Sequence, residues 1–319
     1  MEWFFLIIAV LAFSGWVTAY VYLQCFHSPT DRKDDPYQLI EGEQYDALAD
    51  VILECTRVMD KAPCEHVYIS SHDGLKLHAR YYHTKENAPT MIVMHGYKGN
   101  ALRDGAGGFA LSRQLDFNIL VPDQRAHAKS QGNVITFGVL ERYDCMRWIE
   151  YVNERFGKEN PVVLSGISMG AATILMTTDL HLPSNVVGIM ADCPYASPAG
   201  IICKVCTDRG FPEKFVFPFI SLAAKLLGKF SITESTPAES VKQARIPILL
   251  IHGDDDRFVP CQMSCEIAAN CAGSVDLQIF PGAGHGLAYM TDPERYEAVV
   301  LAFLRRIPQI QPYMDEGKL

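Results

Sequence analysis

The fold is decided by the stretch V-V-L-S-G-I-S-M-G-A-A-T-I-L at residues 162–175. Its first four residues predict a buried β-strand, and the residues from Met169 onward predict a helix. Between them lies the pattern G-x-S-x-G, centred on Ser168. The two glycines allow the backbone to turn sharply under the serine, so that its hydroxyl stands exposed at the edge of a sheet. The start of the helix adds N–H donors for a developing anion. The stretch therefore predicts a nucleophilic serine.

Short apolar runs and amphipathic segments alternate on both sides of this stretch. The runs are rich in Val, Ile and Leu, which is typical of strands buried on both faces of a parallel sheet. We expect strands at 66–70, 77–82, 91–94, 119–121, 162–165, 186–191, 248–251 and 277–280, and helices at 101–115, 139–156, 169–179, 262–272 and 293–306. The turn Asp73-Gly74 predicts that the first two strands form a hairpin. Repeated strand-then-helix order predicts an α/β fold with a mostly parallel, doubly wound sheet.

A serine nucleophile needs a base, and the base needs an orienting carboxylate. Two later strands end in loops that contain these groups. The strand at 248–251 is followed by H-G-D-D-D-R-F-V-P, and the strand at 277–280 is followed by P-G-A-G-H-G. Loops that follow parallel strands gather at the carboxyl edge of the sheet. We therefore expect Ser168, an aspartate from 254–256 and His285 to meet at this edge.

These motifs resemble those of the α/β-hydrolase superfamily, over roughly residues 65 to 307. The sequence is most similar to serine esterase and peptidase-like members that have a small helical lid and follow an N-terminal hydrophobic segment. In the pattern H-G-x-x-D-x-x-V-P, the resemblance implies that Asp256 is the acid of a Ser-His-Asp triad, with Asp254 and Asp255 as alternatives. It also implies that His285 is the base.

The resemblance further implies an oxyanion hole. The pair His95-Gly96 follows the strand at 91–94, as in the family, so the backbone N–H groups of Tyr97 and Met169 are expected to bind the oxyanion. His95 itself is expected to shape this loop.

The segment 123–132 departs from the family pattern D-x-R-G-H-G-x-S-x-G, because alanines stand at positions 126 and 128. Alanine is disfavoured at positive φ, so the shape of this loop is left open. Asp123, Arg125 and His127 are expected to be structural.

One segment breaks the alternation of strands and helices. Residues 194–240 contain five prolines and helical pieces but no good strand, which predicts a helical lid riding on the sheet. Its apolar side chains either line an acyl pocket or pack the lid onto the sheet; these are Phe211, Phe215, Phe217, Phe219 and Leu222.

The first 25 residues predict a transmembrane anchor. Residues 3–23 carry no charge, and a helix of that length crosses a hydrocarbon layer of about 30 Å. A cleaved signal peptide is the alternative, with Val17-Thr18-Ala19 as a cleavage site, although Glu2 stands where a basic region is expected. Arg32 and Lys33 favour a cytoplasmic catalytic domain by the positive-inside rule; the alternative is a secreted or extracytoplasmic one. Ten irregularly spaced cysteines agree with a reducing compartment.

We therefore expect an anchor at 1–25, a linker and helix at 26–62, an α/β-hydrolase domain at 63–310 with a lid at about 194–240, and a tail at 311–319. The 319 residues are 49% hydrophobic and carry a net charge of −9, which excludes disorder and argues against a nucleic-acid partner. The expected activity is hydrolysis of a small-molecule carboxylic ester through an acyl-enzyme. The same machinery acting on thioesters, lipids or peptides is the first alternative, and a non-catalytic binding module is the second. A serine triad needs no metal and no organic cofactor.

Overall fold

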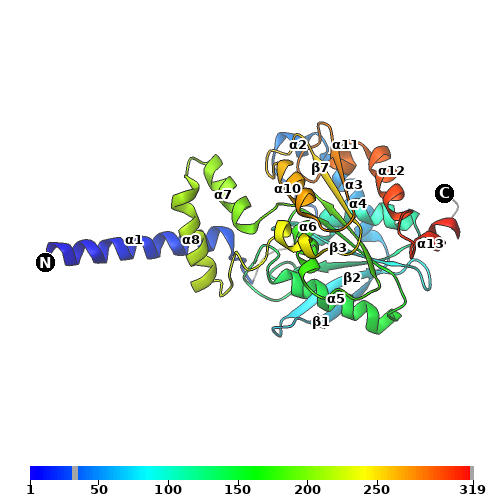
Figure 1. The fold of residues 1–319 in the computed structure, drawn as a ribbon, viewed down its shortest axis with the longest axis horizontal. Coiled ribbons are helices and arrows are strands. Elements are labelled where there is room, and N and C mark those ends of the chain that lie inside the picture. Colours follow the sequence, from blue (N-terminus) through cyan, green and yellow to red (C-terminus); the bar gives the residue numbers. More distant parts are fainter. Residues whose placement is uncertain (31–34, 317–319) are drawn as a thin grey trace.

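Eight strands form one sheet in the order β1-β2-β4-β3-β5-β6-β7-β8 (Figure 1). The computed structural model describes residues 1–30 and 35–316. The strands are β1 (Glu65–Ser70), β2 (Lys76–Tyr82), β3 (Thr90–Met94), β4 (Asn118–Asp123), β5 (Val162–Ile167), β6 (Val186–Asp192), β7 (Ile248–Gly253) and β8 (Val275–Phe280). β1 pairs with β2 and β2 with β4 in antiparallel register, and the other pairs are parallel. The predicted hairpin and the mostly parallel sheet are confirmed.

Helices cover both faces of this sheet. The expected helices are present within a few residues of their predicted ends, as α4 (Ala101–Gln114), α5 (Glu141–Phe156), α6 (Met169–Met176), α10 (Gln262–Asn270) and α12 (Pro293–Leu304). The described chain also contains α1 (Glu2–Cys25), α2 (Glu43–Asp46), α3 (Ala49–Lys61), α7 (Pro198–Asp208), α8 (Glu213–Leu226), α9 (Pro237–Ser240), α11 (Ala288–Thr291) and α13 (Gln311–Glu316), with short 3-10 turns at Thr177–Asp179 and Val241–Gln243.

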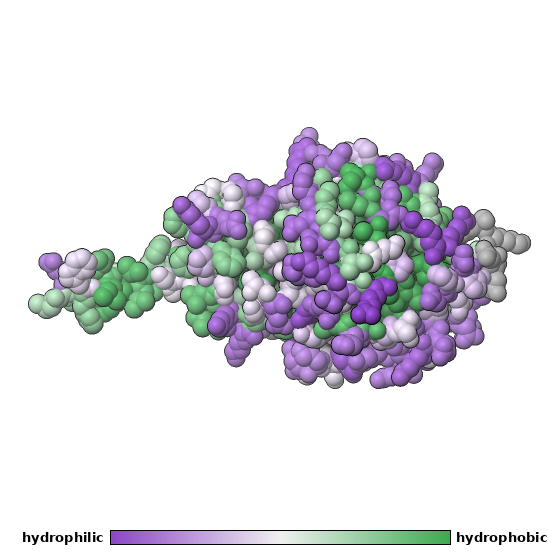
Figure 2. Space-filling model, in the orientation of Figure 1, coloured by the Kyte–Doolittle hydropathy of each residue, from purple (hydrophilic) through white to green (hydrophobic). Residues whose placement is uncertain are grey.

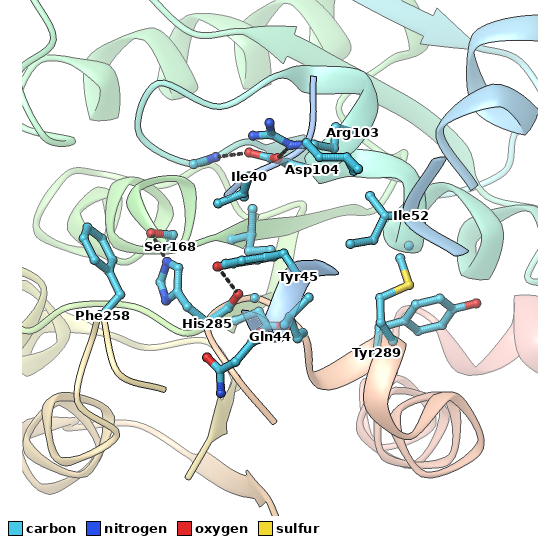
Figure 3. Close-up of a pocket in the computed structure, with 18 of the residues that line it drawn as sticks. Ile40, Gln44, Tyr45, Ile52, Arg103, Asp104, Ser168, Phe258, His285 and Tyr289 are labelled. Carbon is cyan, nitrogen blue, oxygen red and sulfur yellow. Dashed lines mark hydrogen bonds and ion pairs between the residues drawn. The ribbon is translucent and has the colours of Figure 1, made fainter. Parts of the chain in front are cut away.

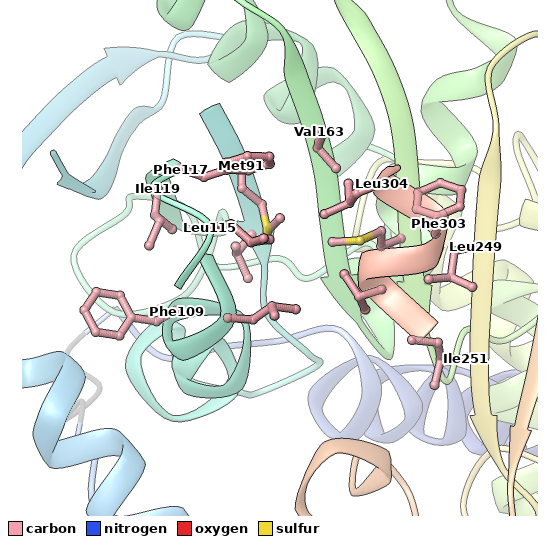
Figure 4. Close-up of a cluster of buried hydrophobic side chains, with 14 of the residues drawn as sticks. Met91, Phe109, Leu115, Phe117, Ile119, Val163, Leu249, Ile251, Phe303 and Leu304 are labelled. Carbon is pink, nitrogen blue, oxygen red and sulfur yellow. The ribbon is translucent and has the colours of Figure 1, made fainter. Parts of the chain in front are cut away.

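The core consists of two layers, because alternate side chains of each strand face opposite sides of the sheet. Met91 and Val163 face α4 and α12, within a cluster that includes Phe109 and Phe303 (Figure 4). The intervening residues, such as Ile92, face α5, α6 and α10. This two-sided burial explains why the strands appear in the sequence as continuous apolar runs.

The carboxyl end of the chain differs from the expected tail. Residues 311–316 form α13, and Met314 is buried in the same cluster as Ile310. A second apolar residue one helical turn after Ile310 lets the chain continue along the core, so the expectation of a tail from residue 311 is wrong for this turn.

The insertion between β6 and β7 is helical; its ends, at Ala196 and Ala238, join the core cluster on one face of the sheet, but its α7–α8 part does not ride on the sheet. α8 packs against α7 and against α1, the helix that projects from the domain (Figure 1). Phe211, Phe215 and Phe217 are exposed. Both expectations for these phenylalanines, lining a pocket or packing onto the sheet, are therefore wrong.

α1 is the one helix among the described residues that is long and apolar enough to cross a membrane, by length and composition alone. A signal sequence passes the same test. Arg32 and Lys33, on which the expected sidedness depends, lie outside the described residues.

Candidate active site

Ser168 occupies a strained turn between β5 and α6. Its backbone has φ 54° and ψ −116°, a combination that costs energy for any residue with a Cβ atom. A Cβ atom on Gly166 would lie 2.5 Å from the carbonyl carbon of Gly170, and one on Gly170 would lie 2.0 Å from the carbonyl oxygen of Met94. Both positions therefore require glycine. The close packing of strand, turn and helix holds the serine above the sheet edge.

Two hydrogen bonds join Ser168, His285 and Asp256. The Nε2 atom of His285 lies 2.9 Å from the Ser168 hydroxyl oxygen, and its Nδ1 atom lies 2.7 Å from an oxygen of Asp256. With Asp256 ionised, Nδ1–H donates to the carboxylate, which leaves Nε2 to accept the serine proton. The three side chains follow β5, β7 and β8, so the parallel strands bring them to one edge.

Asp256 is held as a carboxylate by several donors. The backbone N–H groups of Phe258 and Val259 donate to one oxygen, at 2.9 and 2.7 Å. His252 Nε2 lies 3.2 Å from the other oxygen. Burial alone raises the pKa of Asp256, but the hydrogen bonds from His252 and His285 outweigh burial and hold this pKa below its usual range.

The two alternative aspartates point elsewhere. Asp254 accepts a hydrogen bond from the backbone N–H of Gly282 at 2.6 Å. Asp255 pairs with Arg257 at the surface. Among the three aspartates, it is Asp256 that contacts His285.

The loop at 95–98 lies against the serine. A Cβ atom on Gly96 would be 3.5 Å from the Cβ atom of Ser168. His95 Nδ1 lies 2.9 Å from the Gly96 carbonyl oxygen, and the backbone N–H of Lys98 donates to His127 at 3.1 Å. Met169 is the first residue of α6, so its N–H has no acceptor within the helix. Tyr97 and Met169 thus flank the serine from two elements.

The alanine-containing loop keeps the left-handed backbone that glycines adopt easily. Ala126 has φ 60° and Ala128 has φ 39°. Buried ion pairs stabilise this loop despite the steric cost: Arg125 binds Asp144 at 2.6 Å, and Asp123 lies 2.6 Å from His78 Nδ1. These contacts give Asp123 and Arg125 structural roles.

The end of α1 is bonded to the same 95–98 loop. The Tyr97 hydroxyl donates to the carbonyl oxygen of Cys25 at 2.8 Å and to that of Gln24 at 3.2 Å, and the Lys98 ammonium also donates to Gln24 at 3.2 Å. Phe26 is fully buried and packs edge-on against Phe230. The last turn of α1 is therefore part of the catalytic domain, which nothing in the sequence pattern indicates.

A cavity of about 740 Å³ opens beside Ser168 and His285 (Figure 3). One of its walls is formed by residues 38–45, which the sequence assigns to a linker. Tyr45 donates to the carbonyl oxygen of His285 at 2.8 Å, and Gln44 donates to Asp255 at 2.7 Å. No described residue of the 194–240 insertion lines this cavity, so the expectation that the insertion lines the acyl pocket is wrong for it, and residues 38–45 stand there instead. This stretch, Q-L-I-E-G-E-Q-Y, mixes polar and apolar residues without a helix or strand period, so it offers no sequence signal for this role.

Asp192, at the end of β6, is a buried carboxyl group in the wall of this cavity. One of its oxygens has no hydrogen-bond partner among the described residues. Burial raises its pKa to about 6, although His252 and His285 nearby lower it. The sequence analysis missed this residue, since an aspartate at a strand end has no distinguishing pattern.

Asp192→Asn should change the pH dependence of stability. Between about pH 4 and pH 6 the folded protein keeps a proton on Asp192 that the unfolded chain releases, so wild-type stability falls as pH rises through this window. The Asp192→Asn variant has no carboxyl group at this position and therefore does not lose stability through this window. Relative to wild type, its free energy of unfolding should rise by roughly 3 kcal/mol between pH 4 and pH 7.5, at about 1.4 kcal/mol per pKa unit. Chemical unfolding of the full chain in detergent measures this difference.

Asp276→Asn is the matched control for this measurement. The pKa of Asp276 is lowered: burial raises it, but the hydrogen bonds from Arg306 and Gln278 and the charge of Arg306 together outweigh burial. Its stabilising effect is therefore present at neutral pH and lost as pH falls. The control variant should become less stable relative to wild type as pH rises. An equal effect of Asp192→Asn at both pH values would contradict the assignment.

One group of metal-type donors lies at the triad itself. Ligand atoms of Cys193, Asp256 and His285 lie within 4.8 Å of one another. The hydrogen bonds described above occupy Asp256 and His285, and burial raises the pKa of the Cys193 thiol well above its usual value. A protonated thiol is a poor metal ligand. The donor set therefore fits a triad better than a metal site.

Comparison with known proteins places the chain in a family. The profile of the prolyl oligopeptidase family matches residues 136–310, which is more than half of the chain and includes Ser168, Asp256 and His285. The chain belongs to the prolyl oligopeptidase family. This membership makes it a hydrolase of the α/β-hydrolase superfamily, as the sequence motifs predict.

Proteins similar to this prolyl oligopeptidase family member are found in several bacteria. The Bacillus subtilis protein YqkD is 25% identical over 216 residues, which cover 67% of this chain and 70% of YqkD. The Escherichia coli K12 protein YfhR is 27% identical over 236 residues, which cover 71% and 75%. Both are described as uncharacterized. The Pyrococcus furiosus esterase Pf2001 has the same fold, with a TM-score of 0.64, 20% identity, and coverage of 79% of this chain and 93% of the esterase.

Proposed function

We propose that this protein is a membrane-tethered serine carboxylesterase with Ser168 as nucleophile, His285 as base and Asp256 as the orienting acid. The observation that carries the proposal is the continuous pair of hydrogen bonds from Ser168 through His285 to Asp256, beside a cavity. Nucleophile–base and base–orienter contacts at hydrogen-bond distance are the geometric requirement for acyl transfer.

The reaction follows from this geometry. His285 Nε2 takes the proton of Ser168 as the serine oxygen attacks the ester carbonyl carbon. The resulting oxyanion accepts hydrogen bonds from the N–H groups of Tyr97 and Met169, each worth about 3–4 kcal/mol. The C–O bond to the alcohol then breaks, and His285 returns its proton to the leaving oxygen. A water molecule, deprotonated by His285, releases the acid from Ser168 by the same steps.

The cavity wall favours an apolar acyl group. Its volume of about 740 Å³ lies in the range of small-molecule sites, and apolar side chains such as Ile40, Ile52 and Met290 contribute to its lining. The charged side chains Arg103 and Asp104 pair with each other at 2.9 Å. Arg103 also donates to the carbonyl oxygen of Gln38, which leaves these groups engaged with the protein rather than with a polar substrate.

A larger side chain at Ile52 should shorten the preferred acyl chain. Ile52 lies on α3 in the cavity wall, at a distance from Ser168 along the cavity (Figure 3). In Ile52→Trp the ratio of kcat/KM for p-nitrophenyl octanoate to that for p-nitrophenyl acetate should fall at least tenfold, because the indole fills the space for the longer chain. Val51→Trp, at the exposed neighbouring position, should leave the ratio unchanged. An unchanged ratio in Ile52→Trp would mean that the acyl chain does not reach α3.

Peptide hydrolysis is the second candidate function. The observation that favours it is the family name, which is that of a peptidase. Esterase is the word in the name of the Pyrococcus structure of the same fold. The apolar part of the lining and the pairing of Arg103 with Asp104 favour the ester, since a peptide substrate presents backbone N–H and C=O groups that need partners.

The same proposal retains α1 as an anchor rather than a cleaved signal. Cleavage after Ala19 would leave a six-residue remnant of α1, although Tyr97 and Lys98 hold its last turn, at Gln24 and Cys25, as part of a continuous helix. The catalytic domain is assigned to the cytoplasmic side, in line with the positive-inside expectation and with ten unpaired cysteines in the described chain.

The experiment that tests the esterase is hydrolysis of p-nitrophenyl acetate, butyrate, octanoate and palmitate by the full chain in detergent, beside Ser168→Ala. Turnover that depends on Ser168 supports the proposal, and its maximum gives the acyl length. Absence of turnover, with Ser168 still labelled by a fluorophosphonate, would favour the peptidase. Absence of both would overturn hydrolysis at this site.

A further inference from the structure

Large apolar side chains lie along the outer face of α8, with Phe215, Leu222 and Leu226 exposed and Phe219 half-buried. Phe215, Phe219, Leu222 and Leu226 follow the spacing i, i+4, i+7 and i+11, which places them on one side of a helix. Phe215 is 63% and Leu226 60% exposed. The opposite side of α8, with Ile220, Ala223 and Ala224, is buried. Soluble domains rarely leave such a continuous apolar row uncovered.

α8 lies where α1 enters the domain. Val21, Tyr22 and Cys25 of α1 pack against the cluster that contains the buried side of α8. α8 crosses α1 and lies on the side from which the free part of α1 projects (Figure 1). A helix that crosses a membrane-spanning helix lies along the plane of the membrane, which is the orientation of interfacial helices.

The length of α1 places α8 at the membrane. Only residues 2–13 of α1 are free of the domain on all sides. At about 1.5 Å per residue they span about 18 Å, whereas a hydrocarbon core is about 30 Å thick. If α1 crosses the bilayer, its segment beside α8 must also lie at membrane depth.

The charge around this face suits anionic lipid headgroups. Residues 198–229 contain five basic side chains, Lys204, Arg209, Lys214, Lys225 and Lys229, against two acidic ones, Asp208 and Glu213. The whole chain, in contrast, has a net charge of −9. Figure 2 shows apolar surface, in green, along α1 and in the region where α1 meets the domain, with hydrophilic surface, in purple, beside it. Basic side chains beside a partly inserted apolar face are attracted to an anionic bilayer surface.

We propose that the outer face of α8 is a membrane-docking surface, which inserts Phe215, Phe219, Leu222 and Leu226 into the boundary of an anionic bilayer beside α1. The proposal rests on the anchoring of α1, which belongs to the proposed function, but not on ester hydrolysis. With two elements in the lipid, the catalytic domain has a fixed orientation to the membrane rather than a flexible tether.

Photo-crosslinking of the full chain in vesicles of phosphatidylcholine and phosphatidylglycerol tests this surface. Benzoylphenylalanine replaces Phe215 in one variant and Leu226 in a second, and intact mass measurement after irradiation detects lipid adducts. Phe4, 63% exposed on α1, is the positive control. Tyr68, 47% exposed on β1, is the matched negative control. All four positions are exposed, so the folded state tolerates the probe.

Positions 215 and 226 should form at least tenfold more lipid adduct than position 68. Adducts at position 4 without adducts at 215 and 226 would overturn the docking surface and leave the anchor. Crosslinks from position 215 to a second copy of the chain would show that this face is a protein interface and would overturn the membrane-docking surface. No adduct at position 4 would overturn the anchor and the docking surface together. Hydrolysis by the same samples is measured separately, so failure of the esterase is distinguishable from failure of this surface.

Discussion

Replacing Ser168 with alanine should abolish covalent labelling by a fluorophosphonate and lower kcat for p-nitrophenyl butyrate by roughly 10⁴- to 10⁶-fold. Without the hydroxyl, His285 has no proton to take and no acyl-enzyme can form. The loop at 95–98 and the cavity remain, so weak binding-based catalysis by the oxyanion donors is the expected remainder. Gel fluorescence of the labelled full chain and turnover in detergent measure the two effects.

Ser165→Ala is the matched control for this loss. Ser165 also lines the cavity, but it lies within β5 and pairs in the sheet with its neighbours. Its replacement should leave labelling intact and change turnover by no more than a fewfold. Labelling that survives in Ser168→Ala, or that disappears in Ser165→Ala, would contradict the assignment of Ser168 as the nucleophile.

Asp256→Asn should lower kcat by about 10⁴-fold, since the amide holds His285 in the wrong tautomer and does not stabilise the imidazolium. The neutral side chain still offers an oxygen to the backbone N–H groups of Phe258 and Val259, so the loop should keep its shape. Turnover at pH 8 together with thermal unfolding separates the catalytic effect from a folding defect. A stable variant with greatly reduced kcat is the expected result.

Asp254→Asn, two positions away, tests the specificity of this effect. Asp254 bonds to the backbone of Gly282 and not to His285, so its replacement should change kcat by less than tenfold. A larger loss of kcat in Asp254→Asn than in Asp256→Asn would identify Asp254, not Asp256, as the acid that orients His285. A loss of kcat seen only in Asp192→Asn would identify Asp192, at the end of β6, as the acid that orients His285.

The local pattern of apolar residues in the sequence was sufficient to predict the strands of the sheet. Each parallel strand is a short apolar run, because both of its faces are covered, and this local consequence of burial is visible in the sequence at residues such as 162–165 and 248–251. The requirement for Gly166 is equally local, since a Cβ atom there would meet Gly170 of the same strand–turn–helix unit, whereas Gly170 is required by the carbonyl group of Met94 at the end of β3. Order of the motifs along parallel strands then predicts their meeting at one edge.

The choice among the three aspartates depended on resemblance rather than on pattern. Residues 254–256 are identical in type and adjacent, so no periodicity separates them. Their roles differ only through the conformation of the loop, which directs Asp254 to Gly282, Asp255 to Arg257 and Asp256 to His285.

The sequence by itself determined the α/β sheet, the turn at Ser168 and the order of the residues that meet there, because two-sided burial and the sharp turn each leave a pattern of residue types within a short stretch of the chain. Only the tertiary structure decided that residues 38–45 wall the cavity, that the end of α1 holds Tyr97, and that α8 turns its phenylalanines outward beside α1. These contacts join segments far apart in the chain. Their side chains are ordinary tyrosines, leucines and phenylalanines, whose partners depend on packing and leave no periodic trace in the sequence.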